Sequence, residues 1–70
     1  MQALYDSLDE RALSLGAIQA LVDETELPFW EVRRIYEREF ARLKGSARVK
    51  DYLVVLASRR ARETLSRETG

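Results

Sequence analysis

The sequence contains no cysteine and no histidine, and its 70 residues include only three glycines and one proline. The absence of cysteine excludes disulfide bonds, and a zinc or haem site is not expected without either residue type. Acidic side chains do not form the dense loops that bind Ca²⁺ or Mg²⁺. We therefore expect no metal and no cofactor. Packing or association must supply the stability of such a small chain.

Long apolar runs are also missing. No stretch approaches the roughly 20 apolar residues of a membrane-spanning helix. Asp6, Asp9 and Glu10 interrupt any apolar run of the kind found in a signal peptide. We therefore expect a cytoplasmic protein with no membrane association, and the lack of cysteine is compatible with a reducing compartment.

Groups that carry out catalysis are scarce. No serine has a candidate base in a recognisable motif, and the chain has no glycine-rich phosphate loop. The carboxylates of Glu37 and Glu39 are two positions apart on a predicted helix, so they point in different directions. We predict that the protein is not an enzyme.

The stretch from Leu27 to Leu43 is the centre of the chain, because it holds four of the six aromatic residues. Its apolar positions step by three and four residues, which is the spacing of one face of an α-helix. These positions are Phe29, Val32, Tyr36, Phe40 and Leu43. Pro28 suits a helix start and Gly45 suits a helix end, so we predict a helix over about 28–44.

A second helix is predicted over about 7–25, before this stretch. Ser7 and Glu10 have the spacing of a capping box. Leu8, Leu15, Ile18 and Val22 share one face of this helix. Ser14 offers a second cap, which leaves open whether residues 7–14 are helical. Gly16 weakens the helix by about 1 kcal/mol relative to alanine.

A third helix is predicted over about 47–67, beginning at Ser46 or at Asp51. Its apolar residues cover more than half of its circumference, which exceeds what two partners in a three-helix bundle need. We predict an all-α, compact three-helix bundle spanning 1–70 as one domain, with frayed termini and antiparallel neighbouring helices. The expected core is Ile18, Leu21, Val22, Val32, Tyr36, Phe40, Leu43, Val49, Leu53, Leu56 and Ala57.

Charge is balanced overall but unevenly distributed. Residues 1–27 carry six acids and one base, whereas residues 45–70 carry three acids and six bases. The acidic first third can pair with the basic segments within one monomer or across a dimer. The simpler interpretation is a set of solvated helix faces, because exposed ion pairs contribute little.

Residues 17–40 also suggest a helix-turn-helix, in which Trp30, Arg33, Arg34 and Glu37 would face a DNA groove. The zero net charge and the acidic preceding helix argue against it. A second group of arginines on the last helix offers contacts to phosphate, or covers apolar surface with its stems. A nucleic-acid-binding regulator is therefore the alternative hypothesis. Its phosphate-contacting residues would be Arg33, Arg34, Arg59, Arg60 and Arg62.

Two segments, LPFWEVRRIYEREFARL and ARVKDYLVVLASRRARETL, resemble a family of short, uncharacterised bacterial proteins described as three-helix bundle dimerisation domains, DUF3562. The resemblance covers about Ala17 to Leu65 and is most telling from Val49 to Arg60. Val54 stands where we expect proline in the family. The resemblance implies a helical bundle that self-associates, and it brings no catalytic residues.

We therefore predict a small protein–protein interaction module that forms a homodimer or binds another protein. The wide apolar arc of the last helix supports this prediction, together with a core that is small for an independent domain. Exposed aromatic and apolar side chains are favoured at interfaces. We predict Trp30, Tyr52 and Val55 as the surface anchors.

Overall fold

The computed structural model contains three helices, and it describes residue 5, residues 7–45 and residues 52–69, with residue 69 described by its backbone alone. The helices are α1 (Leu8–Thr25), α2 (Phe29–Lys44) and α3 (Leu53–Thr69). No strand occurs in these ranges. The predicted all-α, three-helix fold is confirmed.

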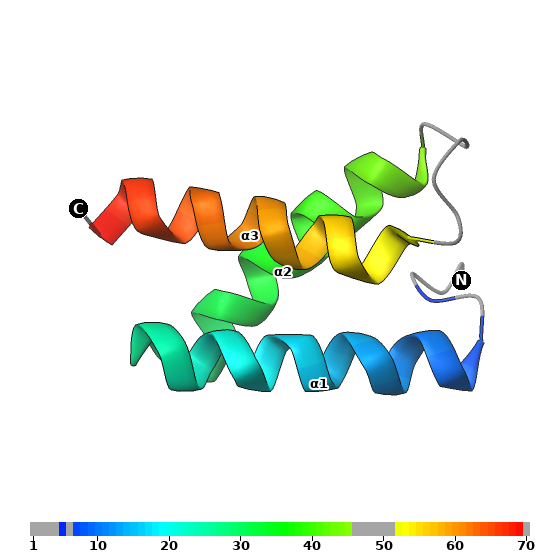
Figure 1. Ribbon diagram of the computed structural model, residues 1–70, viewed down its shortest axis with the longest axis horizontal. Helices are drawn as coiled ribbons and strands as arrows, with labels where there is room; N and C mark the ends of the chain where they lie inside the picture. The colour runs from blue at the N-terminus through cyan, green and yellow to red at the C-terminus, as the bar shows by residue number, and fades with distance from the viewer. Residues whose placement is uncertain (1–4, 6, 46–51, 70) are drawn as a thin grey trace.

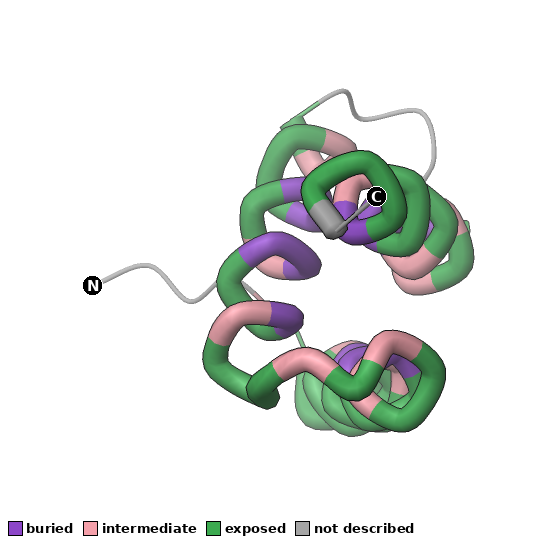
Figure 2. Tube along the Cα trace, turned by 90° about the vertical axis from the view of Figure 1, so that its left-hand side faces the viewer, coloured by how far each residue is buried: buried purple, intermediate pink, exposed green. Residues whose placement is uncertain are grey.

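The three helices form two layers. Figure 1 shows α1 and α3 side by side with the same chain direction, while α2 crosses both obliquely on one side. In this view α1 runs from right to left, α2 returns from left to right and α3 runs from right to left again, so consecutive helices run in opposing directions, as expected, with α2 inclined to both. The contact of α2 with α3 is the most extensive of the three. In Figure 2 the buried positions lie where α2 faces the other two helices.

The ends of α1 follow from local backbone chemistry. Ser7 is the N-cap, and its Oγ accepts a hydrogen bond of 3.1 Å from the backbone N–H of Glu10. The helix is continuous through residues 8–25, so Ser14 is not a second cap. At the other end, Glu26 has a positive φ of 61°, and its N–H donates to the carbonyl of Val22 over 2.8 Å. The left-handed backbone of Glu26 thus closes this end, although glycine is the residue that adopts this conformation without strain.

The end of α2 lies at Lys44, as predicted. Gly45 nevertheless keeps helical backbone angles, with φ −67° and ψ −20°. Glycine is therefore not needed there for its conformational freedom. The short connection to α2 ends in Pro28, whose carbonyl accepts from the N–H groups of Glu31 and Val32.

The buried face of α2 is wider than the sequence suggested, because this helix packs on both α1 and α3. Ile35 is fully buried, although it was not among the expected core residues. Phe29 was placed on the apolar face, but it is exposed at the start of the helix. The buried residues of α2 are Val32, Ile35, Tyr36, Glu39 and Phe40.

The face of α1 predicted from Leu8, Leu15, Ile18 and Val22 is only partly correct: Ile18 is buried and Val22 packs against the core, but the helix is rotated so that the two leucines lie outside. Leu8 is 80% exposed and Leu15 is also exposed, whereas Ser14 is fully buried. The Ser14 Oγ accepts a hydrogen bond of 2.8 Å from the Tyr36 hydroxyl. Two buried hydroxyls that satisfy one another can occupy a core, whereas either one alone would pay a desolvation cost. Hydrophobicity alone could not identify Ser14 as an inward residue.

Most of the predicted core is confirmed, but it is incomplete. Val22 and Leu43 are partly buried against the core, and Leu56 is half-buried outside it. Val49 lies outside the described residues, as do Ser46 and Asp51, the two predicted start positions of the last helix. At its other end α3 extends past Arg67, the predicted end, to Thr69. The core cluster is Ile18, Leu21, Val32, Ile35, Tyr36, Phe40, Leu53, Ala57, Ala61 and Leu65.

Gly16 is a position where a larger residue can stabilise the protein. It lies within α1, and a Cβ built there would meet no atom within 4 Å. We expect Gly16→Ala to raise the free energy of unfolding by about 1 kcal/mol, because alanine restricts the unfolded backbone and favours the helix. Urea denaturation followed by circular dichroism would measure this change. A lower stability would mean that Gly16 has a close-packing role.

The Ser14–Tyr36 pair can be tested by a double-mutant cycle. Ser14→Ala should lower the free energy of unfolding by about 1–3 kcal/mol, because it leaves the buried Tyr36 hydroxyl without its partner. Adding Tyr36→Phe should recover part of that loss. Ser66→Ala, at an exposed position of α3, is the control and should change stability by less than about 0.5 kcal/mol. Strictly additive single and double variants would rule out the coupling.

Candidate functional site

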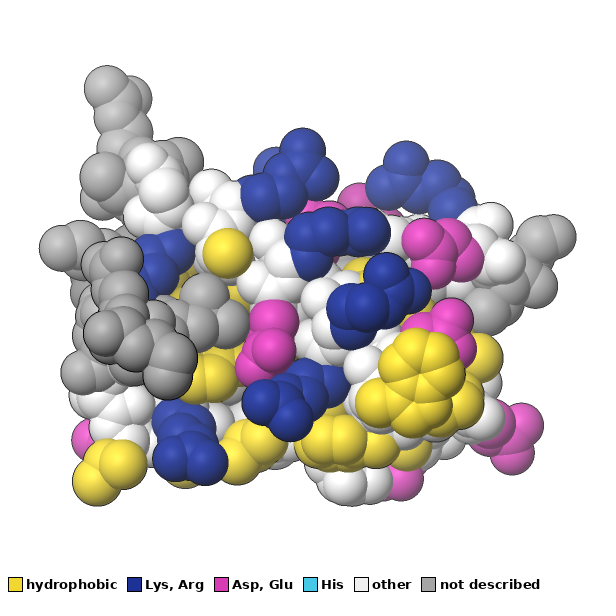
Figure 3. Space-filling view, turned by 180° about the vertical axis from the view of Figure 1, so that it is seen from behind, with side chains coloured by type: hydrophobic (Ala, Val, Ile, Leu, Met, Phe, Trp, Pro, Cys, Tyr) yellow, Lys and Arg dark blue, Asp and Glu magenta, His cyan; other side chains and the backbone are white. Residues whose placement is uncertain are grey.

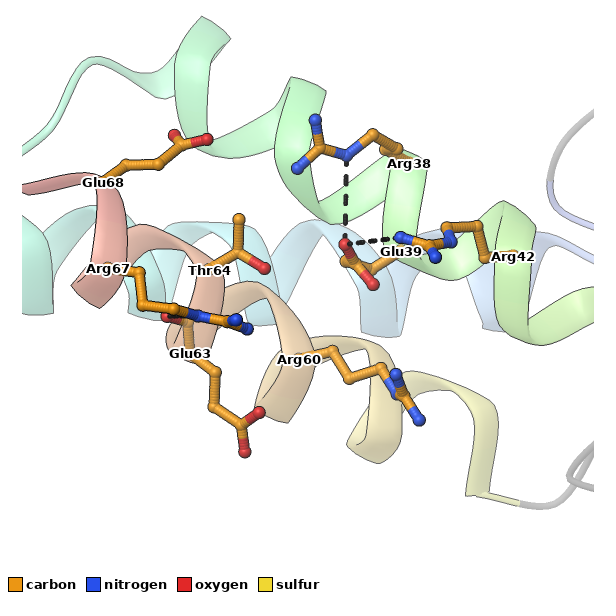
Figure 4. Close-up of a pocket in the computed structure, with 8 residues that line it drawn as sticks. All are labelled: Arg38, Glu39, Arg42, Arg60, Glu63, Thr64, Arg67 and Glu68. Carbon is orange, nitrogen blue, oxygen red and sulfur yellow. Dashed lines mark hydrogen bonds and ion pairs between the residues drawn. The ribbon is translucent and has the colours of Figure 1, made fainter.

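A polar cleft separates α2 from the C-terminal half of α3 (Figure 4). It has a volume of about 480 Å³. Helical spacing places its residues: side chains three, four or seven positions apart share one face of a helix. The lining residues are Arg38, Glu39 and Arg42 from α2, and Arg60, Glu63, Thr64, Arg67 and Glu68 from α3.

Glu39 lies at the base of this cleft and is buried. Arg38 and Arg42 both face its Oε2 atom, from Nε at 3.9 Å and from Nη1 at 3.8 Å (Figure 4). These distances are those of ion pairs and are too long for hydrogen bonds. The positive charges of two guanidinium groups therefore compensate the negative charge of one buried carboxylate. Each arginine brings only one of its nitrogens to an ion-pair distance from Glu39.

The sequence reading missed Glu39, Arg38 and Arg42 as site residues. The signal that could have identified Glu39 is its register, because it lies seven positions after the buried Val32 and four after Ile35. An acidic residue in the apolar stripe of a helix needs compensating cations. Arginines at the positions before and three after it are suitable partners.

The predicted phosphate-contacting arginines of α3 do not form one cluster. Arg60 lines the cleft beside α2, whereas Arg59 is exposed and does not line it. Arg62 turns toward α1, and its Nε lies 3.0 Å from Oε1 of Glu24. Consecutive helical residues differ by about 100° in direction, so Arg59 does not line the cleft that its neighbour Arg60 lines.

The predicted groove-facing residues of α2 are partly engaged within the monomer. The Nε atom of Arg33 donates to Oε2 of Glu37 over 3.3 Å. The Tyr5 hydroxyl donates to the same oxygen over 3.2 Å, and its ring meets Phe40 edge-on at a centroid distance of 5.0 Å. Arg34 is exposed. Figure 3 shows the α2 side of the molecule, where several basic side chains lie near one another in the upper half of the view, with acidic side chains beside them.

The three predicted interface anchors are all exposed, but they are not together. Trp30 is 66% exposed at the start of α2, and Val55 is 65% exposed near the start of α3. Figure 1 places these two helix starts toward opposite ends of the molecule. Tyr52 is exposed directly before α3. Trp30 therefore belongs to a different surface from Val55.

Val55 instead lines a groove together with Leu13, which was not predicted as an interface residue. A groove of about 350 Å³ runs between the starts of α1 and α3, and no described residue of α2 lines it. Leu13 contributes to this groove from α1 and is exposed. The lining residues are Ser7, Asp9, Glu10, Leu13, Leu53, Val54 and Val55.

The hydroxyl groups of Tyr5 and Tyr36 make the stability of the fold depend on pH in the alkaline range. Burial raises the pKa of Tyr5 well above its usual value of 10.0, and the neighbouring Glu37 carboxylate raises it further. Burial also raises the pKa of Tyr36. The folded chain thus holds these protons more tightly than the unfolded chain does. The resulting stability is fully present below about pH 10 and declines as pH rises beyond it.

We expect the free energy of unfolding to decline above about pH 10, and to decline less steeply in Tyr5→Phe, which has no proton to lose there. Urea denaturation at a series of alkaline pH values would measure the slopes. Tyr52→Phe, at an exposed tyrosine, is the matched control and should follow the wild type. Equal slopes for Tyr5→Phe and the wild type would contradict the assignment.

No group of metal-binding side chains occurs in the part of the chain that the structure describes. None of the described helices combines the length and apolar character that crossing a membrane requires.

Comparison with known proteins identifies a family. A family model described as a protein of unknown function (DUF3562) matches residues 13–69. This match confirms the family resemblance inferred from the sequence. No curated protein and no solved structure matches the chain.

Proposed function

Because the chain belongs to the DUF3562 family, for which no function is described, we propose its role from its surfaces: it is a protein–protein interaction module that forms a homodimer. The side of the α1–α3 layer that faces away from α2 is the proposed interface. We call this side the open face, and Leu13 and Val55 lie on it. No catalytic role is assigned to any residue.

The observation that carries the proposal is an apolar groove on the open face, which described residues of α1 and α3 line and no described residue of α2 lines. Figures 1 and 2 show α2 on one side of the α1–α3 layer, with no described helix on the other. Leu13 and Val55 are exposed at the groove, while Leu53 and Val54 form deeper parts of its lining. Apolar side chains gathered in a groove favour burial against a partner.

The directions of the helices favour a second copy as that partner. The helices α1 and α3 run side by side in the same direction. A two-fold axis along that direction sets α1 of each copy against α3 of the other, so that the apolar groove of one copy meets the same groove of its partner. Such an interface is self-complementary and closes at two copies.

The size of the molecule is compatible with such a dimer. A stable interface buries about 800 Å² on each partner. The accessible surface of the chain is 5169 Å², so an interface of this size would cover about one sixth of it. The two-helix open face provides a surface of this kind, and its burial would add to the small core of a 70-residue domain.

The test compares two substitutions at equally exposed apolar positions in the first turn of a helix. We expect sedimentation equilibrium of the wild type to give about twice the 8.1 kDa chain mass. Val55→Glu places a charge in the proposed interface and should weaken dimerisation by at least about tenfold, because a buried unpaired carboxylate is costly. Trp30→Glu lies on α2, away from the open face, and should leave the dimer intact.

Circular dichroism of both variants would establish that the helices remain folded. A wild type that stays monomeric at millimolar concentration would overturn the proposal. A dimer that is disrupted by Trp30→Glu and not by Val55→Glu would place the interface on α2. The nucleic-acid alternative gains no support from the described residues, because Arg33 and Arg62 are paired with acids and only Arg60 of the five arginines lines the cleft between α2 and α3.

A further inference from the structure

We infer that the cleft between α2 and α3 is a binding site for phosphate, either free or as the phosphate group of a small molecule. The inference does not depend on self-association, because the cleft residues do not line the groove of the open face. It is carried by the arrangement of arginines around Glu39.

The charged side chains that line the cleft leave a positive excess. They are Arg38 and Arg42 of α2 and Arg60 and Arg67 of α3, against the carboxylates of Glu39, Glu63 and Glu68. Four guanidinium groups and three carboxylates have a net charge of +1. Figure 4 shows that Glu63, on the α3 side, points away from Glu39. A phosphate carries about −1.5 to −2 charges at neutral pH, so a cleft with this excess attracts it.

The arginines that line the cleft also have N–H groups that make no hydrogen bond to a described residue. Arg38 and Arg42 each use one nitrogen at an ion-pair distance from Glu39. Arg67 donates from Nε to the carbonyl of Glu63 over 3.5 Å, and its two Nη groups have no hydrogen bond to a described residue. Arg60 likewise makes no hydrogen bond or ion pair within the described part of the chain. Each guanidinium group presents five N–H groups, and phosphate oxygens accept them in pairs.

The buried carboxylate gives the site its order. Arg38 and Arg42 both approach Oε2 of Glu39 at ion-pair distances, which brings their guanidinium groups to the same wall of the cleft. Thr64 adds a neutral hydroxyl donor on the α3 wall. The volume of about 480 Å³ is in the range of small-molecule sites, and it accommodates a phosphate with a small organic group attached.

Titration with inorganic phosphate, followed by NMR of the arginine Nε–Hε groups at constant ionic strength, tests this inference. We expect saturable shifts at Arg38, Arg42 and Arg67. Arg67→Ala should weaken phosphate binding by about tenfold or more, since it removes charge-assisted hydrogen bonds. Arg67→Lys keeps the charge but loses the planar fork, so its affinity should be intermediate. Arg59→Ala, at an exposed arginine of the same helix that does not line the cleft, should bind phosphate as the wild type does.

A parallel titration with glycerol phosphate distinguishes the two sources of the ligand. Tighter binding of the ester supports a phosphorylated small molecule, and equal binding supports free phosphate. Shifts that do not saturate, or that are equally large at Arg33, Arg34 and Arg59, would show a general ionic atmosphere and overturn the inference. Binding of duplex DNA without saturable binding of phosphate would overturn it as well.

Discussion

The hydrogen bond between Ser14 and Tyr36 is the constraint on which the arrangement of α1 depends. Both residues are fully buried, and their oxygens lie 2.8 Å apart. A hydroxyl at this depth needs a partner, so α1 must turn Ser14 toward α2. That rotation directs Ile18 and Leu21 into the core and leaves Leu13 and Leu15 outside. The same rotation of α1 that pairs Ser14 with Tyr36 therefore determines which of its apolar side chains are available to a partner.

The oblique position of α2 determines which of its residues are buried. Since it contacts both other helices, its buried face is broad enough to include Ile35 on one side and Glu39 at the edge. Burial of Glu39 in turn recruits Arg38 and Arg42, because an isolated carboxylate would be strongly disfavoured there. The arginine-lined cleft is thus a by-product of how α2 packs, and its shape is fixed by the core beneath it.

The two proposed sites divide the surface by chemistry. The open face of the α1–α3 layer carries exposed apolar side chains in a groove, and we propose that it binds a second copy of the chain. The cleft between α2 and α3 is polar and rich in arginine, which suits a small anion. The zero net charge of the chain does not reveal this difference between surfaces, because the negative charge of α1 offsets the positive charge of α2 and α3. Self-association and anion binding can therefore occur at the same time.

By itself the sequence determined the three helices and most of the core. Apolar spacing placed Val32, Tyr36 and Phe40 inward, and the Ser7 cap and the end at Lys44 were readable because they depend on neighbouring residues alone. The tertiary structure decided the rotation of α1, the burial of Ser14 and Glu39, and which arginines meet. These features depend on contacts between residues far apart in the chain, as in the pairing of Ser14 with Tyr36 or of Arg62 with Glu24. Helical periodicity gives each side chain a direction about its own helix axis, but only packing decides which direction faces another helix.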